Sequence, residues 1–120
     1  MDKVSIILRR SPYGTVNAGE AIRHLLGAES NNFKGYLFLV DDGVYTGKKG
    51  QSTEGTEWIN LAESFSMISP EEELSPEVYA EEESAKKRGL TGDDLVEGIK
   101  ITNMKFIAKT ISESKGFLIF

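Results

Sequence analysis

Short apolar runs alternate with amphipathic helical patterns along the first third of the chain. Residues 3–9 form an almost unbroken β-branched run, which is typical of a central strand covered on both faces. A turn follows at residues 11–14, and apolar positions then recur at helical spacing from Ala18 until Gly27, where we expect the helix to end. Residues 35–40 are a second buried-strand pattern. This order predicts a strand, a helix and a parallel strand.

The rest of the chain continues the alternation in shorter elements. Residues 44–55 are rich in Gly, Lys, Ser and Thr, so we expect a loop there, with one helical turn around Tyr45. Residues 58–65 have a helical pattern, and residues 69–76 form an acidic, proline-bounded connection. The remaining expected elements are a strand at 78–80, a helix at 82–87, a helical turn at 91–96, a strand at 99–101, a helix at 104–111 with Asn103 as its cap, and a strand at 117–120.

This pattern predicts the α/β class, with a mostly parallel sheet and helices on both of its faces. A length of 120 residues fits one domain, residues 1–120, and permits a hydrophobic core that needs no disulfide or metal. The chain contains no cysteine, which excludes thiolate nucleophiles, cysteine metal sites and disulfides. His24 is the only histidine, so we expect no metal site, and no motif indicates a cofactor.

The net charge and the hydropathy pattern exclude two further classes of partner. The formal net charge of -5 argues against a protein that binds the phosphate backbone of nucleic acid. The N-terminal apolar run, residues 4–8, is shorter than the core of a signal peptide and far shorter than a membrane span. We therefore expect a cytoplasmic protein without a nucleic-acid or membrane partner.

Three turns are expected at the carboxyl edge of the sheet, where α/β folds bind their ligands. The first, residues 11–15, offers backbone N–H groups and the Thr15 hydroxyl at a helix start, with Gly14 in the turn and Arg10 beside it. This arrangement suits an anion, but the same residue types are ordinary turn and cap chemistry, and the segment lacks a phosphate-loop pattern. Both interpretations remain open.

The second turn contains Asp41 and Asp42 followed by Gly43, and the third lies around Glu81. Two aspartates side by side suggest acid–base chemistry, although Asp-Asp-Gly after a strand is first of all a turn. Asp41 and Glu81 are conceivable partners in a carboxylate enzyme, but no spacing argument shows that they meet.

Four segments in order resemble the DsrE/DsrF-like family, which includes the sulfur-relay subunits TusC and TusD. They are VSIILRRSPYGT, YLFLVDDGVYTGKKGQ, VYAEEESAKKRGL and DLVEGIKITNMKFIAKTISESKGFLIF, and together they cover nearly the whole chain. The resemblance implies a three-layer α/β/α fold with a five-stranded sheet. It also implies assembly into homo-oligomers, or into hetero-oligomers with DsrE-like paralogues.

Carrier members of this family hold a persulfide on one cysteine, placed after the third strand and before a helix that ends in Arg-Gly. Counting back seven residues from Arg88 places Glu81 at this position. A carboxylate cannot form a persulfide, because sulfur relay proceeds through a thiolate. The resemblance therefore implies a noncatalytic, TusC-like or DsrF-like subunit that accompanies a cysteine-bearing partner.

Glu81 itself has two interpretations. We favour a solvated member of the acidic run 81–83, because charge runs are usually exposed. Alternatively, Glu81 occupies the cysteine crevice at a helix start, where the helix dipole favours its charge.

The main functional hypothesis is an oligomerising subunit, and the alternative is a small-molecule or anion-binding domain that uses the carboxyl-edge loops. Candidate interface anchors are Tyr45, Trp58, Phe65, Tyr79 and Phe120.

Overall fold

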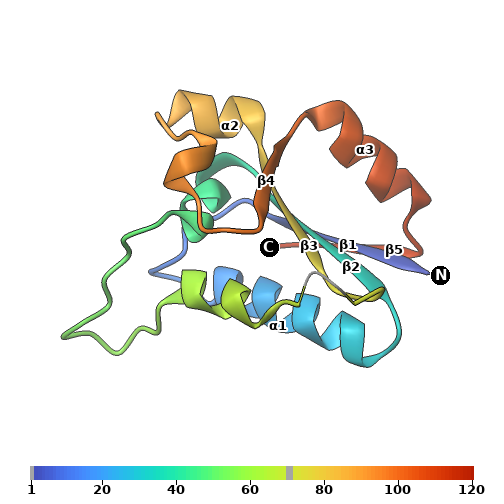
Figure 1. The fold of residues 1–120 in the computed structure, drawn as a ribbon, viewed down its shortest axis with the longest axis horizontal. Helices are drawn as coiled ribbons and strands as arrows, with labels where there is room; N and C mark the ends of the chain where they lie inside the picture. The colour runs from blue at the N-terminus through green and yellow to red at the C-terminus, as the bar shows by residue number, and fades with distance from the viewer. Residues whose placement is uncertain (1, 70–71) are drawn as a thin grey trace.

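The computed structural model describes residues 2–69 and 72–120, which form a five-stranded parallel sheet with helices packed against it (Figure 1). The strand order is β4-β3-β2-β1-β5, and each neighbouring pair is parallel. The strands are β1 (Lys3–Leu8), β2 (Lys34–Leu39), β3 (Glu77–Glu81), β4 (Ile99–Thr102) and β5 (Gly116–Ile119). The helices are α1 (Asn17–Ser30), α2 (Glu82–Lys87) and α3 (Met104–Glu113), and the 3₁₀ helices are η1 (Asp41–Gly47), η2 (Leu61–Met67) and η3 (Gly92–Asp94).

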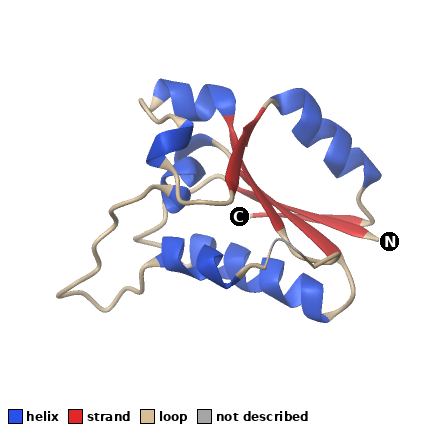
Figure 2. Cartoon of the chain, in the orientation of Figure 1, coloured by secondary structure: helices blue, strands red, loops and turns tan. Residues whose placement is uncertain are grey.

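The central strands are buried on both faces because helices cover each side (Figure 2). Ile6 and Leu37 belong to the cluster that includes the apolar stripe of α1. Ile7 and Phe38, one residue further along each strand, pack in a second cluster with Ile107 of α3. Successive side chains of a strand point to opposite faces, so two covered faces require continuous apolar runs. The predicted α/β/α architecture with a parallel five-stranded sheet is confirmed.

Helix α1 extends beyond the predicted end at Gly27 and continues to Ser30. Ala28 is buried, so the apolar stripe passes through Gly27 rather than ending there. The helix ends where Asn31 donates a side-chain hydrogen bond to the Gly27 carbonyl and Asn32 takes a left-handed φ of 64°. The stop signal is therefore the Asn-Asn pair, because asparagine tolerates the left-handed conformation better than other non-glycine residues.

The segment between β2 and β3 also differs from the prediction. The helical turn expected around Tyr45 is present, as part of η1. The helix expected from residue 58 begins only at Leu61, because the Asn60 side chain accepts the Ala62 N–H and caps η2 at that point. The acidic connection 69–76 lies partly outside the described residues.

Helix α3 begins as predicted, with the Asn103 side chain accepting the Phe106 N–H at 2.8 Å. Its buried face differs from the predicted stripe, since Ile107 and Thr110 are buried whereas Met104 and Ala108 are exposed. In the described part of the chain, no helix combines the length and the apolar character needed to cross a membrane.

Candidate functional site

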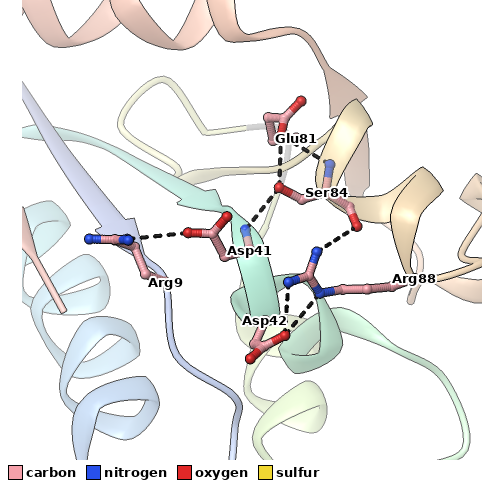
Figure 3. Close-up of polar contacts among 6 residues, drawn as sticks. All are labelled: Arg9, Asp41, Asp42, Glu81, Ser84 and Arg88. Carbon is pink, nitrogen blue, oxygen red and sulfur yellow. Dashed lines mark hydrogen bonds and ion pairs between the residues drawn. The ribbon is translucent and has the colours of Figure 1, made fainter.

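Glu81 is the last residue of β3 and caps α2 at the carboxyl edge of the sheet (Figure 3). One carboxylate oxygen accepts the Glu83 N–H at 2.6 Å. The other accepts the Ser84 N–H at 3.0 Å and the Ser84 hydroxyl at 2.7 Å. Only 5 % of the residue is exposed, so the favoured interpretation of a solvated charge is wrong. The side chain turns back to satisfy the free N–H groups at the helix start, which compensates the cost of burying it.

Ser84 connects this carboxylate to the loop after β2. Its hydroxyl donates to Glu81 and accepts the backbone N–H of Asp41 at 2.8 Å. The Asp41 carboxylate faces Arg9 instead, with the Arg9 Nε at 3.2 Å in an exposed ion pair (Figure 3). The structure therefore joins residues 41 and 81 through a backbone amide and a hydroxyl. Among the described residues, no hydrogen bond joins their two carboxylates directly, and each carboxylate has its own partners.

Arg88, the residue that follows α2, connects this helix to η1 through an ion pair with Asp42. Its Nε lies 2.9 Å from the Asp42 carboxylate, and its Nη1 donates to the Ser84 carbonyl at 3.1 Å. The sequence pattern predicted a functional role for neither Arg88 nor Ser84. A signal for Ser84 existed, because a hydroxyl three residues after a capping carboxylate is well placed to bond to it.

The turn after β2 needs a glycine at residue 43 because the end of β1 leaves no room for a side chain. A β-carbon at this residue would lie 2.1 Å from the Leu8 carbonyl oxygen, which is much closer than van der Waals contact. The loop therefore presses directly onto the end of β1, and this contact sets where Asp41 and Asp42 emerge. Two aspartates followed by a glycine are thus explained by packing as well as by ion pairing.

The other predicted ligand residues lie on the turn before α1. Arg10 and Gly14 are exposed, and Gly14 has a left-handed φ of 97°. The Thr15 hydroxyl accepts the Asn17 N–H at 3.3 Å, so it is engaged at the start of α1. The Tyr13 hydroxyl donates to the Gln51 side chain and accepts the Leu61 N–H at 3.4 Å, so it connects this turn to the loop after η1 and to η2. None of the hydrogen bonds among the described residues joins Arg10, Gly14 or Thr15 to Glu81.

The predicted interface anchors fall into two groups. Phe65 and Tyr79 are 6 % and 8 % exposed and pack in the core, which leaves neither available to a partner. Burial, together with the hydrogen bond to Glu77, raises the pKa of Tyr79 well above its usual range. Tyr45 and Phe120 are half-buried, and Trp58 is exposed with its ring edge-on to another aromatic ring. Trp58 therefore offers the largest accessible aromatic surface of the five.

Several known proteins resemble this chain. The model of the DsrE/DsrF-like family matches residues 2–120. An uncharacterised protein of Methanopyrus kandleri is 31% identical over 100% of this chain and 95% of its own length. The intracellular sulfur oxidation protein DsrF of Allochromatium vinosum is 38% identical over 79% of this chain and 68% of its own length. The crystal structure of the ychN protein from E. coli superposes with a TM-score of 0.86 at 22% identity, with both chains fully covered.

These findings agree with the strand order and with the motifs that suggested the resemblance. The match extends through β5, the last strand, so it includes every element of the sheet. The chain belongs to the DsrE/DsrF-like family.

Proposed function

We propose that this protein is a noncatalytic subunit that assembles with its own copies or with a cysteine-bearing paralogue and supports intracellular sulfur relay through that partner. One observation carries the proposal. A buried, fully hydrogen-bonded carboxylate, Glu81, stands where the family resemblance puts the reactive thiol. With no cysteine in the chain, a relay role requires a thiol from another subunit. The relative from Allochromatium vinosum, named as an intracellular sulfur oxidation protein, supports the same pathway class.

The edge strand β5 supports the assembly part of the proposal. It lies at one end of the sheet, and each of its residues is exposed. Phe117 and Ile119 are 57 % and 60 % exposed although both are large and apolar. An apolar edge strand favours association, because water contact is costly for its side chains and its outer backbone groups are free to pair.

Sedimentation velocity on the purified chain, alone and mixed with a cysteine-bearing paralogue, tests the assembly. We expect a species larger than the monomer, and we expect Ile119→Glu to weaken its formation about tenfold or more, because a charge would be buried at the contact. Ser52→Glu, which adds the same charge on the exposed loop after η1, is the matched control and should assemble normally. A chain that stays monomeric at high concentration and binds no paralogue would overturn the proposal.

Replacing Glu81 with cysteine tests whether the crevice of the family is still present. After treatment with a persulfide donor, we expect Glu81→Cys to retain one added sulfur atom in intact-mass spectrometry. The donors at Glu83 and Ser84 that now hold a carboxylate would then stabilise the persulfide anion. Glu82→Cys, on an exposed neighbour, is the control and should lose its sulfur faster. No retained sulfur on Glu81→Cys would contradict the assignment of residue 81 to the relay position.

A further inference from the structure

A cavity of about 900 Å³ lies beside β3 and β4, between η2 and the loop that follows η1. The elements that surround it can be followed in Figure 1 as the yellow-green η2, the green loop before it and the strands β3 and β4. Its volume falls within the range of about 300 to 1,000 Å³ that is typical of small-molecule pockets. Among the described residues, its wall includes neither Glu81 nor Asp41, so the cavity is separate from the site above.

The floor of the cavity is apolar. Val78 and Ile99 are register partners on β3 and β4, and both line it. Phe65 and Ile68 contribute from the side of η2, and Val96 contributes from the segment before β4. On the same face of the sheet, the long helix α1 packs against β1 and β2. The short η2 beside it leaves this space open near the outer strands. An apolar floor of this extent favours an aliphatic or aromatic ligand body.

The wall of the cavity is more positive than the rest of the chain. Four lysines and three glutamates line it, whereas the whole chain has a net charge of -5. Lys34 and Glu77, both in the wall, pair with each other at 3.1 Å, which leaves three lysines and two glutamates. Lys48 and Lys49 have no ion pair with any described carboxylate. The charge of the wall therefore favours an anionic group on the ligand.

The loop that carries these two lysines is held firmly in place. The Gln51 side chain donates to the carbonyls of Tyr45, Thr46 and Lys48 at 3.2, 2.9 and 2.9 Å. The Lys49 N–H donates to the Asp94 carbonyl at 2.8 Å, which ties the loop to the segment before β4. Because the backbone is already fixed, a ligand has only the two lysine side chains to order when it binds.

We infer that this cavity binds a small amphipathic anion, with its apolar body on Val78 and Ile99 and its carboxylate or similar group beside Lys48 and Lys49. The inference is independent of the sulfur-relay proposal, because it uses no residue of the Glu81 network. Decanoate, which combines a ten-carbon chain with one carboxylate, is a suitable probe.

Isothermal titration calorimetry of the full chain with decanoate provides the test. We expect about one decanoate per chain with a Kd below about 1 mM, and weaker binding of decanol and of decyltrimethylammonium. Lys48→Gln/Lys49→Gln should raise the Kd about fivefold or more, whereas the exposed control Lys86→Gln/Lys87→Gln should leave it within about twofold. Ser66→Trp, which adds a ring from the exposed side of η2, should block the cavity and abolish binding.

Four results would overturn the inference. The first is no saturable binding of decanoate. The second is equal binding of decanoate, decanol and decyltrimethylammonium. The third is an unchanged Kd in the double lysine variant. The fourth is a Ser66→Trp chain that keeps its circular dichroism spectrum and still binds decanoate normally. If decanoate fails to bind and Ser66→Trp instead weakens self-association, the cavity is a contact between copies of the chain and not a ligand site.

Discussion

At the scale of single residues, Glu81 stabilises the start of α2. Its carboxylate accepts three hydrogen bonds from the first turn of this short helix. We expect Glu81→Ala to lower the free energy of unfolding by about 1 to 3 kcal/mol, since it removes a cap and leaves buried donors unpaired. Urea denaturation measures this loss.

The adjacent Glu82 supplies the control for that measurement. It is exposed, so Glu82→Ala should change stability by no more than about 0.5 kcal/mol. Equal losses in the two variants would show that residue 81 contributes only as one of several surface charges. The capping role would then be wrong.

Tyr79 gives the molecule a specific sensitivity to alkaline pH. Burial first, and the hydrogen bond to Glu77 second, raise its pKa in the folded state above the ordinary value of 10.0. The unfolded chain therefore loses this proton first as pH rises above 10.0, so the stabilising contribution is complete below that pH and declines above it.

We expect Tyr79→Phe to make stability decline less steeply above this pH, and thermal unfolding at a series of alkaline pH values would measure the slope. Tyr45→Phe, at a half-buried ring, is the control and should keep the wild-type slope. An identical slope in Tyr79→Phe and the wild type would contradict this account.

Residue roles were the least predictable level of the structure. Counting from Arg88 identified position 81, yet its burial was missed because a run of three glutamates resembles a solvated surface. Only the geometry shows that its side chain folds back onto Ser84. Phe65 was predicted at an interface and lies in the core, because an aromatic residue on a helical stripe fits either place.

At the scale of elements, two glycines with similar local sequence signals have opposite structural roles. Gly43 lies against the end of β1, where a β-carbon would meet the Leu8 carbonyl oxygen at 2.1 Å. Gly27 lies inside α1 with nothing within 4 Å of the added atom. We expect Gly43→Ala to destabilise the fold by about 3 kcal/mol and Gly27→Ala to stabilise it by about 0.5 to 1 kcal/mol.

Thermal or urea unfolding would check that Gly43→Ala lowers the free energy of unfolding and that Gly27→Ala raises it. A tolerated Gly43→Ala would mean that the loop after β2 shifts freely, and the placement of Asp41 beside Ser84 would lose its support. A destabilised Gly27→Ala would contradict the uninterrupted helix.

Element identity was predictable where periodicity was strong, and element boundaries were not. The central strands β1 and β2 appeared as apolar runs because two covered faces leave no position for alternating polar residues. Helix ends depended on single side chains instead. Asn60 starts η2 three residues after the predicted start, and Asn31 ends α1 beyond Gly27. Such caps compete locally with several equivalent candidates, and tertiary packing selects among them.

At the scale of the whole molecule, the architecture followed from the order of the elements, while assembly and ligands depend on surfaces that a sequence pattern does not reveal. The exposed β5 edge and the cavity beside β4 lie at opposite ends of the sheet order. The proposed subunit contact and the proposed ligand cavity therefore lie on opposite sides of the central strands. The Glu81 network lies at the carboxyl edge, at the end of β3.

The most direct test is intact-mass spectrometry of the wild-type chain after incubation with a donor of labelled sulfane sulfur, alone and together with a cysteine-bearing paralogue. We predict that the label appears only on the paralogue, and that native spectra show the two chains in one complex. Label retained by the wild-type chain alone, and passed on to an acceptor thiol, would contradict the central claim that this subunit has lost the sulfur nucleophile and acts through its partner.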